Sequence, residues 1–452
     1  MNSKETLSDI REKVRPLFEQ LYAAGHATYL VGGAVRDLLR ETTPKDIDLA
    51  TTAHPEEILR LLSDRYSVIP TGIRFGTVTV LLDDEPVEIT TLRIESDYLD
   101  RRRPSTVRFT DRIEEDLARR DFTINAMAFD LRDGRLIDPF GGRRDLRRGI
   151  VRAVGDPEQR FREDALRTLR AVRFAVRLGF EIEPKTLEAA RKKSFLLEFV
   201  AWERIARELK EMLLSEQPGR AIRLLRRIDA LHLILPEVEA CWDFDQRNPH
   251  HADLLHEHLL KVMERVPARW PLRLAALLHD VGKPATRTVD ERGIAHYYGH
   301  ERVGAKLTRR VCRRLRLSHA DTARAVFLVR MHMLPPEAGP RVFRRLLREV
   351  GAEATEDLVY LREADLAVHA HAPKLKLRER LEQVLAEKQQ TVRLAVNGYD
   401  VMQATGLSSS PEVGRILRRL QEIVDGDPTL NQRETLLRLL RREIDVANER
   451  ER

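Results

Sequence analysis

The chain has 452 residues, with 79 Lys and Arg against 72 Asp and Glu, and 33% of its residues are charged. This length exceeds what a single core usually serves, so we expect two to four domains. A formal charge of +7 permits a nucleic-acid partner without requiring one. No apolar run reaches membrane-spanning length, residues 1–20 are too charged for a signal peptide, and two unpatterned cysteines suit a reducing compartment. We therefore expect a soluble cytoplasmic protein with no membrane partner.

The first 155 residues alternate short apolar strands with helices. Helices are expected over residues 5–25, 34–40 and 55–63. Strands are expected over residues 28–32, 46–50, 66–69, 76–82 and 86–92. Residues 95–105 are polar and predict a mobile loop.

Beyond residue 155 strand patterns vanish and helical periodicity continues to the end of the chain. The expected fold class is α+β, a small mixed-sheet head followed by an all-helical neck, body and tail. The expected domains are 1–145 for the head, 146–249 for the neck, 250–372 for the body and 373–452 for the tail.

A Gly-Gly turn, Gly32–Gly33, and two aspartates surround one strand–turn–helix unit. Asp46 and Asp48 are one residue apart, so on a strand their carboxylates point to the same face. Glu88, on a later strand, is a natural third carboxylate. Three such acids can hold two Mg²⁺ ions beside a triphosphate at the glycine turn. The pattern indicates phosphoryl or nucleotidyl transfer, although an isolated Asp-x-Asp is more often an exposed turn.

Arg120 follows a short helical segment and could neutralise phosphate as a bidentate donor. The alternative is a charge pair at a surface helix end.

The segment 162–173 is predicted to be helical, and its charged residues are spaced by three. This places Asp164, Arg167 and Arg170 on one face, which Arg173 continues. A carboxylate accepts from an exocyclic amino group, and a guanidinium donates to a ring nitrogen. Cytosine and adenine both offer that combination, whereas guanine and uracil offer the reverse. An Asp–Arg pair could therefore select C and A without a nucleic-acid template, because wrong bases would leave buried groups unpaired. An ordinary salt-bridged helix is the alternative.

With these segments the chain resembles bacterial class II tRNA nucleotidyltransferases, the CCA-adding enzymes, over nearly its whole length. The matching segments are Leu30–Asp37 with Asp46–Asp48, Thr71–Val78, Glu88–Arg93, Arg119–Asn125 and Glu163–Arg167. The resemblance implies a polymerase-β-type head that adds CCA to tRNA 3′ ends from CTP and ATP and releases pyrophosphate. It implies metal at Asp46 and Asp48, and nucleotide contacts at Gly33, Arg36, Arg120, Asp164, Arg167, Arg170 and Arg173.

Two relatives of that family differ in short segments. Bacterial poly(A) polymerases usually carry a basic Arg-Arg-Phe stretch where this chain has Thr71–Thr77, so the sequence favours tRNA. Enzymes that add only CC typically lack a loop corresponding to residues 94–106, which here includes Asp97, Tyr98, Asp100 and Arg101–Arg103. An enzyme that adds only the terminal A stays open.

A second motif, His279-Asp280 followed by Gly-Lys-Pro, resembles the HD phosphohydrolase superfamily. The other candidate ligands are His258, His300, His332 and Asp365, with His256 as an alternative to His258. Imidazole and carboxylate ligands suit Mn²⁺, Ni²⁺, Fe²⁺ or Zn²⁺. The resemblance implies hydrolysis of 2′,3′-cyclic or terminal phosphates, which would restore a free 3′-hydroxyl on damaged tRNA. A domain kept for tRNA binding or packing is the alternative, as is a hydrolase whose head binds RNA.

Helical residues 392–445 carry recurrent Lys and Arg at positions 415, 418, 419, 433, 438, 441 and 442. Such helices can follow RNA phosphates without reading sequence, and the alternative is a solvated face. The resemblance favours tRNA contact.

Overall fold

The computed structural model describes residues 6–96, 106–247, 253–368, 376–388 and 394–440. The chain divides into two compact units, Met1–Glu239 with Arg314–Leu317, and Ala240–Arg313 with Ser318–Arg452. The first contains a mixed sheet followed by helices, and the second is mainly helical. The predicted α+β class is therefore confirmed, while the division into four domains stays a prediction.

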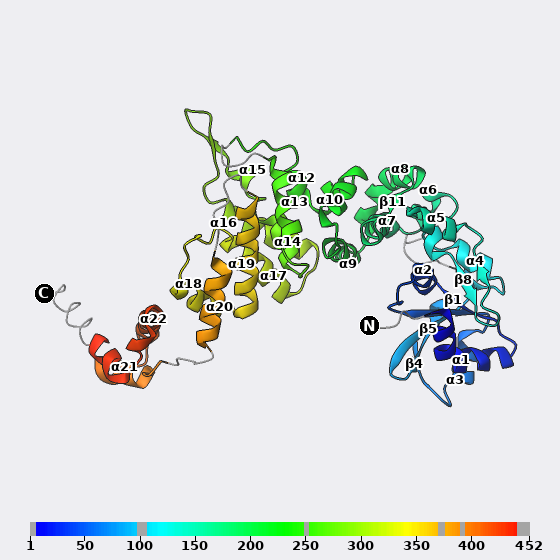
Figure 1. Ribbon diagram of the computed structural model, residues 1–452, viewed down its shortest axis with the longest axis horizontal. Helices are drawn as coiled ribbons and strands as arrows, with labels where there is room; N and C mark the ends of the chain where they lie inside the picture. The colour runs from blue at the N-terminus through cyan, green and yellow to red at the C-terminus, as the bar shows by residue number, and fades with distance from the viewer. Residues whose placement is uncertain (1–5, 97–105, 248–252, 369–375, 389–393, 441–452) are drawn as a thin grey trace. The chain divides into compact units, whose positions relative to one another are not determined.

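The head is built on a mixed sheet whose strand order, within the described residues, is β3-β4-β5-β2-β1-β8-β9 (Figure 1). The strands are β1 (Thr28–Val31), β2 (Ile47–Thr51), β3 (Ser67–Gly72), β4 (Thr77–Leu82), β5 (Glu85–Thr91), β8 (Ala128–Asp130) and β9 (Leu136–Ile137). β2 and β5 run parallel, and the other neighbours run antiparallel. The five predicted strands are confirmed, and the parallel pair joins the two segments that carry the predicted carboxylates.

Three helices accompany the sheet: α1 (Leu7–Ala23), α2 (Gly33–Leu39) and α3 (Pro55–Leu62). α1 begins at a capping box in which the hydroxyl of Thr6 accepts from the backbone of Asp9 and the Asp9 carboxylate accepts from the backbone of Thr6. Its buried residues follow a helical period: Ile10, Val14, Leu17, Phe18 and Leu21. In the view of Figure 1, α1 and α3 lie on one side of the sheet and α2 on the other. The predicted helices are thus present, with bounds shifted by one or two residues.

The polar segment predicted as a loop is bordered by a hairpin. β6 (Arg93–Ser96) pairs antiparallel with β7 (Thr106–Phe109). The predicted loop residues Asp97, Tyr98, Asp100 and Arg101–Arg103 lie outside the described residues. The structure therefore describes the strands on either side of this segment.

Two short helices, α4 (Ile113–Ala118) and η2 (Thr123–Asn125), precede the last two strands of the sheet. The helices after the sheet, up to Glu239, are α5 (Gly142–Arg148), α6 (Pro157–Glu163), α7 (Leu166–Leu178), α8 (Pro184–Lys193), η3 (Ser194–Phe199), α9 (Trp202–Leu213), α10 (Pro218–Arg227), α11 (Leu231–Ile234) and α12 (Pro236–Glu239). The helix predicted over 162–173 is wrong in one respect, because Asp164 has extended backbone between α6 and α7. Its carboxylate accepts from the backbone N–H of Leu166 (3.1 Å). A short acceptor side chain of this kind competes with helical hydrogen bonding and favours a helix start.

The second unit contains α13 (Leu255–Arg265), α14 (Leu272–Leu278), α15 (Lys283–Thr286), α16 (His300–Arg314), α17 (His319–Met331), α18 (Pro340–Glu349), α19 (Ala352–Ala367), α20 (Leu377–Lys388), α21 (Gly398–Thr405), α22 (Pro411–Gly426) and η4 (Pro428–Leu430). The expectation that strands vanish after residue 155 is wrong in detail. β10 (Ile150–Val151) pairs with β11 (Glu181–Ile182), and β12 (Thr288–Val289) pairs with β13 (Ala295–His296). Two-residue strands are too short to leave an alternating pattern in the sequence.

Candidate active sites

The three predicted carboxylates of the head lie at the parallel pair β2–β5. Asp48 on β2 is in register with Glu88 on β5, and Asp46 immediately precedes β2. Asp46 and Glu88 are exposed, whereas Asp48 is half-buried. Burial, then the charges of Glu88 and Asp46, raise the pKa of Asp48 to about 6 against the opposing effect of Arg120. The pair therefore concentrates negative charge at one edge of the strands.

This concentration of oxygen donors fits a divalent cation. Carboxylates are the ligands that Mg²⁺ takes, and Mg²⁺ keeps several waters besides one or two carboxylates. Burial first, and then the charge of Glu88, raise the pKa of Asp48, and a bound cation would counter both effects. The donor set is thus suited to Mg²⁺.

The glycine turn lies against Asp48 and Arg120. Gly32 has φ 71° and ψ −130°, and a Cβ there would lie 3.0 Å from Arg120 Nη1 and 3.7 Å from Asp48 Oδ2. Glycine therefore supplies both the backbone conformation and the space beside these two groups. Arg120 Nη2 pairs with Asp116 Oδ2 (3.2 Å), while its buried Nε has no hydrogen-bond partner within the described residues. The structure brings Gly32, Arg120 and Asp48 together as predicted from sequence.

A buried hydrogen-bond chain connects the head to the helices after it. Arg36 Nη1 donates to Asn125 Oδ1 (2.7 Å), and Asn125 Nδ2 donates to Asp121 Oδ1 (3.1 Å). Arg170 Nε donates to Asp121 Oδ2 (2.7 Å). The ring of Phe174 lies 5.4 Å from the guanidinium carbon of Arg36 and of Arg170. Three predicted nucleotide contacts are thereby gathered at one ring, since Arg173 also lies over Phe174 at 4.4 Å.

Asp121 carries the negative charge of this chain. Burial alone would raise the pKa of Asp121, but Arg170 first, then the Asn125 amide, outweigh burial and lower it to about 2. A carboxylate with a lowered folded-state pKa contributes stability above its unfolded value, near 4, and loses it as pH falls towards 2.

We predict that Asp121→Asn lowers the stability of the first unit at neutral pH by about 2 kcal/mol, falling to about half that at pH 3. Urea unfolding of full-length wild type and variant at both pH values measures the difference. Asp64→Asn, which changes an exposed aspartate of the same unit, is the matched control. A gap between wild type and Asp121→Asn that is unchanged at pH 3 would contradict this assignment.

Asp164 and Arg167, predicted to read the base together, each have another ionic partner in the described part of the chain. Asp164 Oδ2 instead pairs with Arg204 Nη2 (2.7 Å), from α9. Arg167 Nη1 pairs with Glu163 Oε2 (2.8 Å), and its Nη2 donates to the carbonyl of Arg119 (2.9 Å). The expectation of one shared helix face fails because the chain breaks between α6 and α7 at Asp164. Both groups therefore have other polar partners, and their joint contact with a base stays a prediction.

Some polar partners in the first unit had no recognisable sequence signal. Asn125 lies within a matching segment but carries no charge that would mark it as a ligand. Arg204 and Glu208, and the aromatic Phe174, lie in ordinary amphipathic helices. Glu208 Oε2 accepts from Arg173 Nε (2.6 Å). These residues hold the predicted arginines in place, which only packing reveals.

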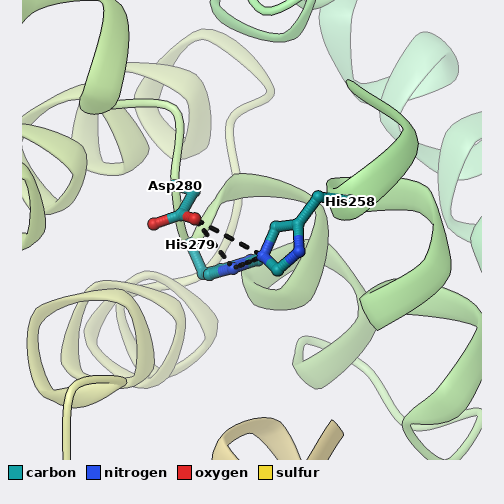
Figure 2. Close-up of side chains that lie close together, drawn as sticks. All are labelled: His258, His279 and Asp280. Atoms are coloured by element: carbon teal, nitrogen blue, oxygen red, sulfur yellow. Dashed lines mark hydrogen bonds and ion pairs between the residues drawn. The ribbon is translucent and has the colours of Figure 1, made fainter. Parts of the chain in front are cut away.

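The second site gathers the predicted histidines and acids in one buried cluster of the second unit. His258 is on α13, His279 and Asp280 follow α14, His300 begins α16, His332 follows α17, and Asp365 is on α19. Figure 2 shows His258 facing His279 and Asp280. The Nε2 atoms of His258 and His279 are 3.1 Å apart, and those of His300 and His332 are 3.2 Å apart. All six predicted ligands of this site are thus buried together.

Asp280 stands between the two histidine pairs. Its Oδ2 lies 3.5 Å from His258 Nε2 and 3.4 Å from His279 Nε2. Its Oδ1 lies 3.1 Å from His300 Nε2 and 3.5 Å from His332 Nε2. Within the described residues these form two groups with ligand atoms within 4.8 Å, and Asp280 belongs to both. The carboxylate can therefore serve a cation on either side.

The hydrogen bonds of the rings fit metal ligation. The Nδ1 atoms of His279, His300 and His332 each lie 2.8 Å from the carbonyl oxygen three residues earlier. A carbonyl only accepts, so each Nδ1 carries the proton and a neutral ring turns the Nε2 lone pair inward. This outer hydrogen bond is the usual support of a metal-ligating histidine.

The acids of the cluster and its burial shift the pKa values of the histidines in opposite directions. Burial opposes a charged ring, but Asp280 and Asp365 outweigh it and raise the pKa of His279 to about 10, whereas burial lowers the pKa of His258 and His332. Although burial opposes it, Asp280 also raises the pKa of His300. Positive charge is therefore favoured among the converging donors, where a divalent cation would replace protons.

Packing favours His258 over His256 as the ligand. The ring of His256 stacks on Trp242 at 4.3 Å, and its Nδ1 accepts from the backbone of Asp243 (3.2 Å). His258 Nε2 instead lies 3.2 Å from Asp365 Oδ1. Only His258 faces the cluster.

Comparisons with known proteins agree with both sites. The "Poly A polymerase head domain" matches residues 28–152, the "Probable RNA and SrmB-binding site of polymerase A" matches 179–241, and the "HD domain" matches 256–367. The "A-adding tRNA nucleotidyltransferase" of Deinococcus radiodurans is 36% identical over 416 residues, covering 87% of this chain and 90% of that protein. The chain belongs to the tRNA nucleotidyltransferase family. The metal-dependent chemistry of both domain types is consistent with the two ligand clusters.

Other tRNA nucleotidyltransferases match more locally or by fold. The "CCA-adding enzyme" of Lactobacillus helveticus is 47% identical over 220 residues, 49% of this chain and 54% of that protein, and that of Bacillus subtilis is 47% identical over 213 residues, 47% and 53% respectively. The chain thus spans about half the length of these CCA-adding relatives. The Bacillus stearothermophilus CCA-adding enzyme in complex with CTP has a TM-score of 0.73 and 28% identity, covering 97% of this chain and 98% of that one.

Two sequence predictions concern surfaces of the molecule. In the described part of the chain, no helix has both the length and the apolar character needed to cross a membrane. In the tail, Arg415, Arg418, Arg419, Arg433 and Arg438 are exposed, and positions 441 and 442 lie outside the described residues. Contact of this tail with tRNA stays a prediction.

Proposed function

We propose that this tRNA nucleotidyltransferase adds CCA to the 3′ end of tRNA in the cytoplasm, using CTP and ATP without a nucleic-acid template and releasing pyrophosphate. The observation that carries the proposal is the junction of the Gly32 turn, Arg120 and the register pair Asp48–Glu88. Similarity to CCA-adding enzymes over the first half of the chain, and to the CTP complex over its whole length, supports it.

Each group of residues in the head site has a separate role in nucleotide addition. Asp46, Asp48 and Glu88 would hold Mg²⁺, which when bound supplies activation of a hydroxyl and neutralisation of phosphate charge. Arg120 and Arg36, with the amides of the glycine turn, bind the triphosphate. The tRNA 3′-hydroxyl attacks the α-phosphorus, and the bond to the pyrophosphate leaving group breaks. The buried chain through Asn125 and Asp121 keeps Arg36 and Arg170 in fixed positions.

A second function for the head is addition of A alone. The observation that favours it is the Deinococcus radiodurans A-adding relative, which matches nearly the whole chain. Poly(A) addition is a further alternative within the same chemistry, disfavoured by Thr71–Thr77. Incubation with ATP, with and without CTP, of tRNA lacking CCA and of tRNA ending in CC separates these activities. Extension of CC-ended tRNA alone would establish the A-only function.

We infer that Asp164 and Arg167 select the base once their present partners, Arg204 and Glu163, are displaced or shared. Asp164→Ala is expected to reduce discrimination of CTP and ATP against GTP and UTP by about tenfold or more, with little change in Mg²⁺ dependence. Glu211→Ala, an acid on α9 that pairs with Arg177, is the control. The measurement is the ratio of kcat/KM for each nucleotide, and an unchanged C/A preference in Asp164→Ala would remove the base-reading role.

A metal-dependent phosphohydrolase is proposed for the HD domain. Its support is the inward-facing histidine set around Asp280, which suits Mn²⁺, Ni²⁺, Fe²⁺ or Zn²⁺. Such a cation supplies a nucleophilic water at neutral pH. Hydrolysis of a 2′,3′-cyclic phosphate adds water across one P–O ester bond, leaving a phosphomonoester and a hydroxyl. Removal of a terminal phosphate then restores the 3′-hydroxyl that the head requires. If the head proved inactive, this hydrolase with an RNA-binding head would be the main function.

A further inference from the structure

An exposed aromatic pair lies just before His300, a predicted ligand of the HD cluster, in the chain. Tyr298 is 80% exposed, and its ring stacks on that of His296 with a centroid separation of 5.6 Å and an interplanar angle of 6°. His296 Nε2 is held at 3.0 Å from Asp290 Oδ2, at the base of the β12–β13 hairpin. The pair is therefore a preformed, solvent-facing aromatic surface rather than part of a core.

The chain connects this pair directly to the metal ligands. Tyr298 lies two residues before His300, and the Nδ1 of His300 donates to the carbonyl of Tyr297 (2.8 Å). Tyr297 is buried and its hydroxyl donates to the carbonyl of Gln246 (2.5 Å). The segment that positions one ligand thus also fixes the aromatic pair at the surface.

A row of cations lies along α16, the helix that begins at His300. Arg302, Lys306, Arg309 and Arg313 are exposed along α16, the helix that His300 begins. At 100° per residue they fall within a narrow face about 16 Å long. Lys306, Arg309 and Arg313 make no ion pair within the described residues, whereas Glu301, the acid on α16, pairs with Arg330 (3.0 Å) and with Arg302 (3.6 Å). Unpaired cations at this spacing attract a chain of phosphates.

We propose that His296, Tyr298 and the basic face of α16 bind the single-stranded 3′ end of an RNA and present its terminal phosphate to the HD cluster. The proposal rests on the hydrolase function proposed above. The terminal base stacks on Tyr298, and the preceding phosphates follow Arg302, Lys306, Arg309 and Arg313. An aromatic platform beside a basic track is the combination that recognises single-stranded nucleic acid. An acidic peptide could pair with the cations, but it would have no base to stack on Tyr298.

The stacking half is tested with full-length protein and a short RNA whose 3′-terminal base is 2-aminopurine and whose end is a 2′,3′-cyclic phosphate. Fluorescence of 2-aminopurine should be quenched on binding to wild type. Tyr298→Ala should weaken binding about tenfold and abolish the quenching, while Tyr298→Phe should retain both. Val289→Ala removes an exposed aliphatic side chain of the same hairpin and should behave as wild type. Quenching and affinity unchanged in Tyr298→Ala would overturn the proposal.

The basic half is tested by salt dependence of the same binding. Lys306→Gln/Arg309→Gln should reduce the slope of log Kd against log salt by about 1.4, for two lost phosphate contacts. Arg341→Gln/Arg345→Gln, on α18, should leave the slope unchanged. An unchanged slope in the first double variant would overturn the track.

Hydrolysis by wild type distinguishes failure of the proposed RNA-binding surface from failure of the proposed phosphohydrolase. With Mn²⁺, p-nitrophenyl phosphate carries no base and probes the HD cluster alone. If wild type hydrolyses neither this ester nor the RNA end, while RNA binding depends on Tyr298 and Lys306, the hydrolase fails and the surface stands. If the ester is hydrolysed and RNA binding is the same in Tyr298→Ala and Lys306→Gln/Arg309→Gln as in wild type, the RNA-binding surface is wrong and the phosphohydrolase is supported.

Discussion

Asp48→Asn is expected to lower nucleotide addition to tRNA by at least about a thousandfold, because it removes a charged ligand at the centre of the head site. Asp48 is in register with Glu88, and burial, followed by the charge of Glu88, raises the pKa of Asp48 to about 6. An amide at this position removes the charge that would hold the cation. The measurement is the rate of CTP and ATP incorporation at saturating Mg²⁺.

Glu85→Gln is the matched control for this variant. Glu85 is an exposed acid at the start of β5, the strand that carries Glu88, and it pairs with Lys13. Its substitution should leave incorporation within about twofold, because an exposed ion pair contributes little. Phosphoester hydrolysis at the HD cluster should be unchanged in Asp48→Asn. Retention of a tenth or more of wild-type incorporation in Asp48→Asn would show that the catalytic metal lies elsewhere.

Asp280→Asn is expected to reduce metal-dependent phosphoester hydrolysis by at least about a hundredfold. Substitution of groups that merely support a ligand typically costs ten- to a hundredfold, and Asp280 stands within 3.5 Å of an Nε2 atom of four histidines. Lys283 also pairs with its Oδ2 (2.6 Å), so the variant leaves that ammonium with a weaker partner. Hydrolysis of p-nitrophenyl phosphate and Mn²⁺ affinity by calorimetry are the measurements.

Nucleotide addition shows whether the effect of Asp280→Asn is confined to the HD cluster. The head carboxylates belong to the other unit, so incorporation should stay within about twofold of wild type. His256→Gln is the matched control, because His256 stacks on Trp242 outside the cluster. Full hydrolysis in Asp280→Asn would contradict the metal site, and loss of hydrolysis in His256→Gln alone would reverse the ligand assignment.

The head could be predicted closely because its signals are local. Alternating apolar residues define β2 and β5, and the spacing of Asp46 and Asp48 places them at one strand end. Their proximity to Glu88 depends on β2 and β5 being neighbours, which the register of the two strands shows. The turn at Gly32 could also be predicted, from the Gly-Gly pair in the sequence. The structure gives the reason for glycine there, a positive φ close to Arg120.

The base-reading region was predicted less well because its partners come from separate helices. A repeat of three residues indicates one helical face, but Asp164 leaves the helix and turns to Arg204. No spacing in the sequence connects residues forty positions apart. The same holds for Asn125 and Asp121, whose importance appears only when Arg36 and Arg170 are brought against them.

The HD cluster lies between these cases. Its ligands were recognisable by the His-Asp motif and by order along the chain, but His256 and His258 are both on α13 and differ by about 200° around it. Sequence spacing could not choose between them. The choice depends on which face of α13 packs towards α14, and the structure gives that face to His258.

The most direct test of the central claim is product length on a tRNA that lacks CCA. With CTP alone we predict addition of two nucleotides and no more, and with CTP and ATP together a product extended by C, C and A. Because the pocket is expected to accept C and A through Asp164 and Arg167, GTP and UTP should add nothing. Sequencing of the tRNA 3′ ends reads all of these outcomes at once. Extension only of tRNA already ending in CC, with no incorporation of C, would contradict the account.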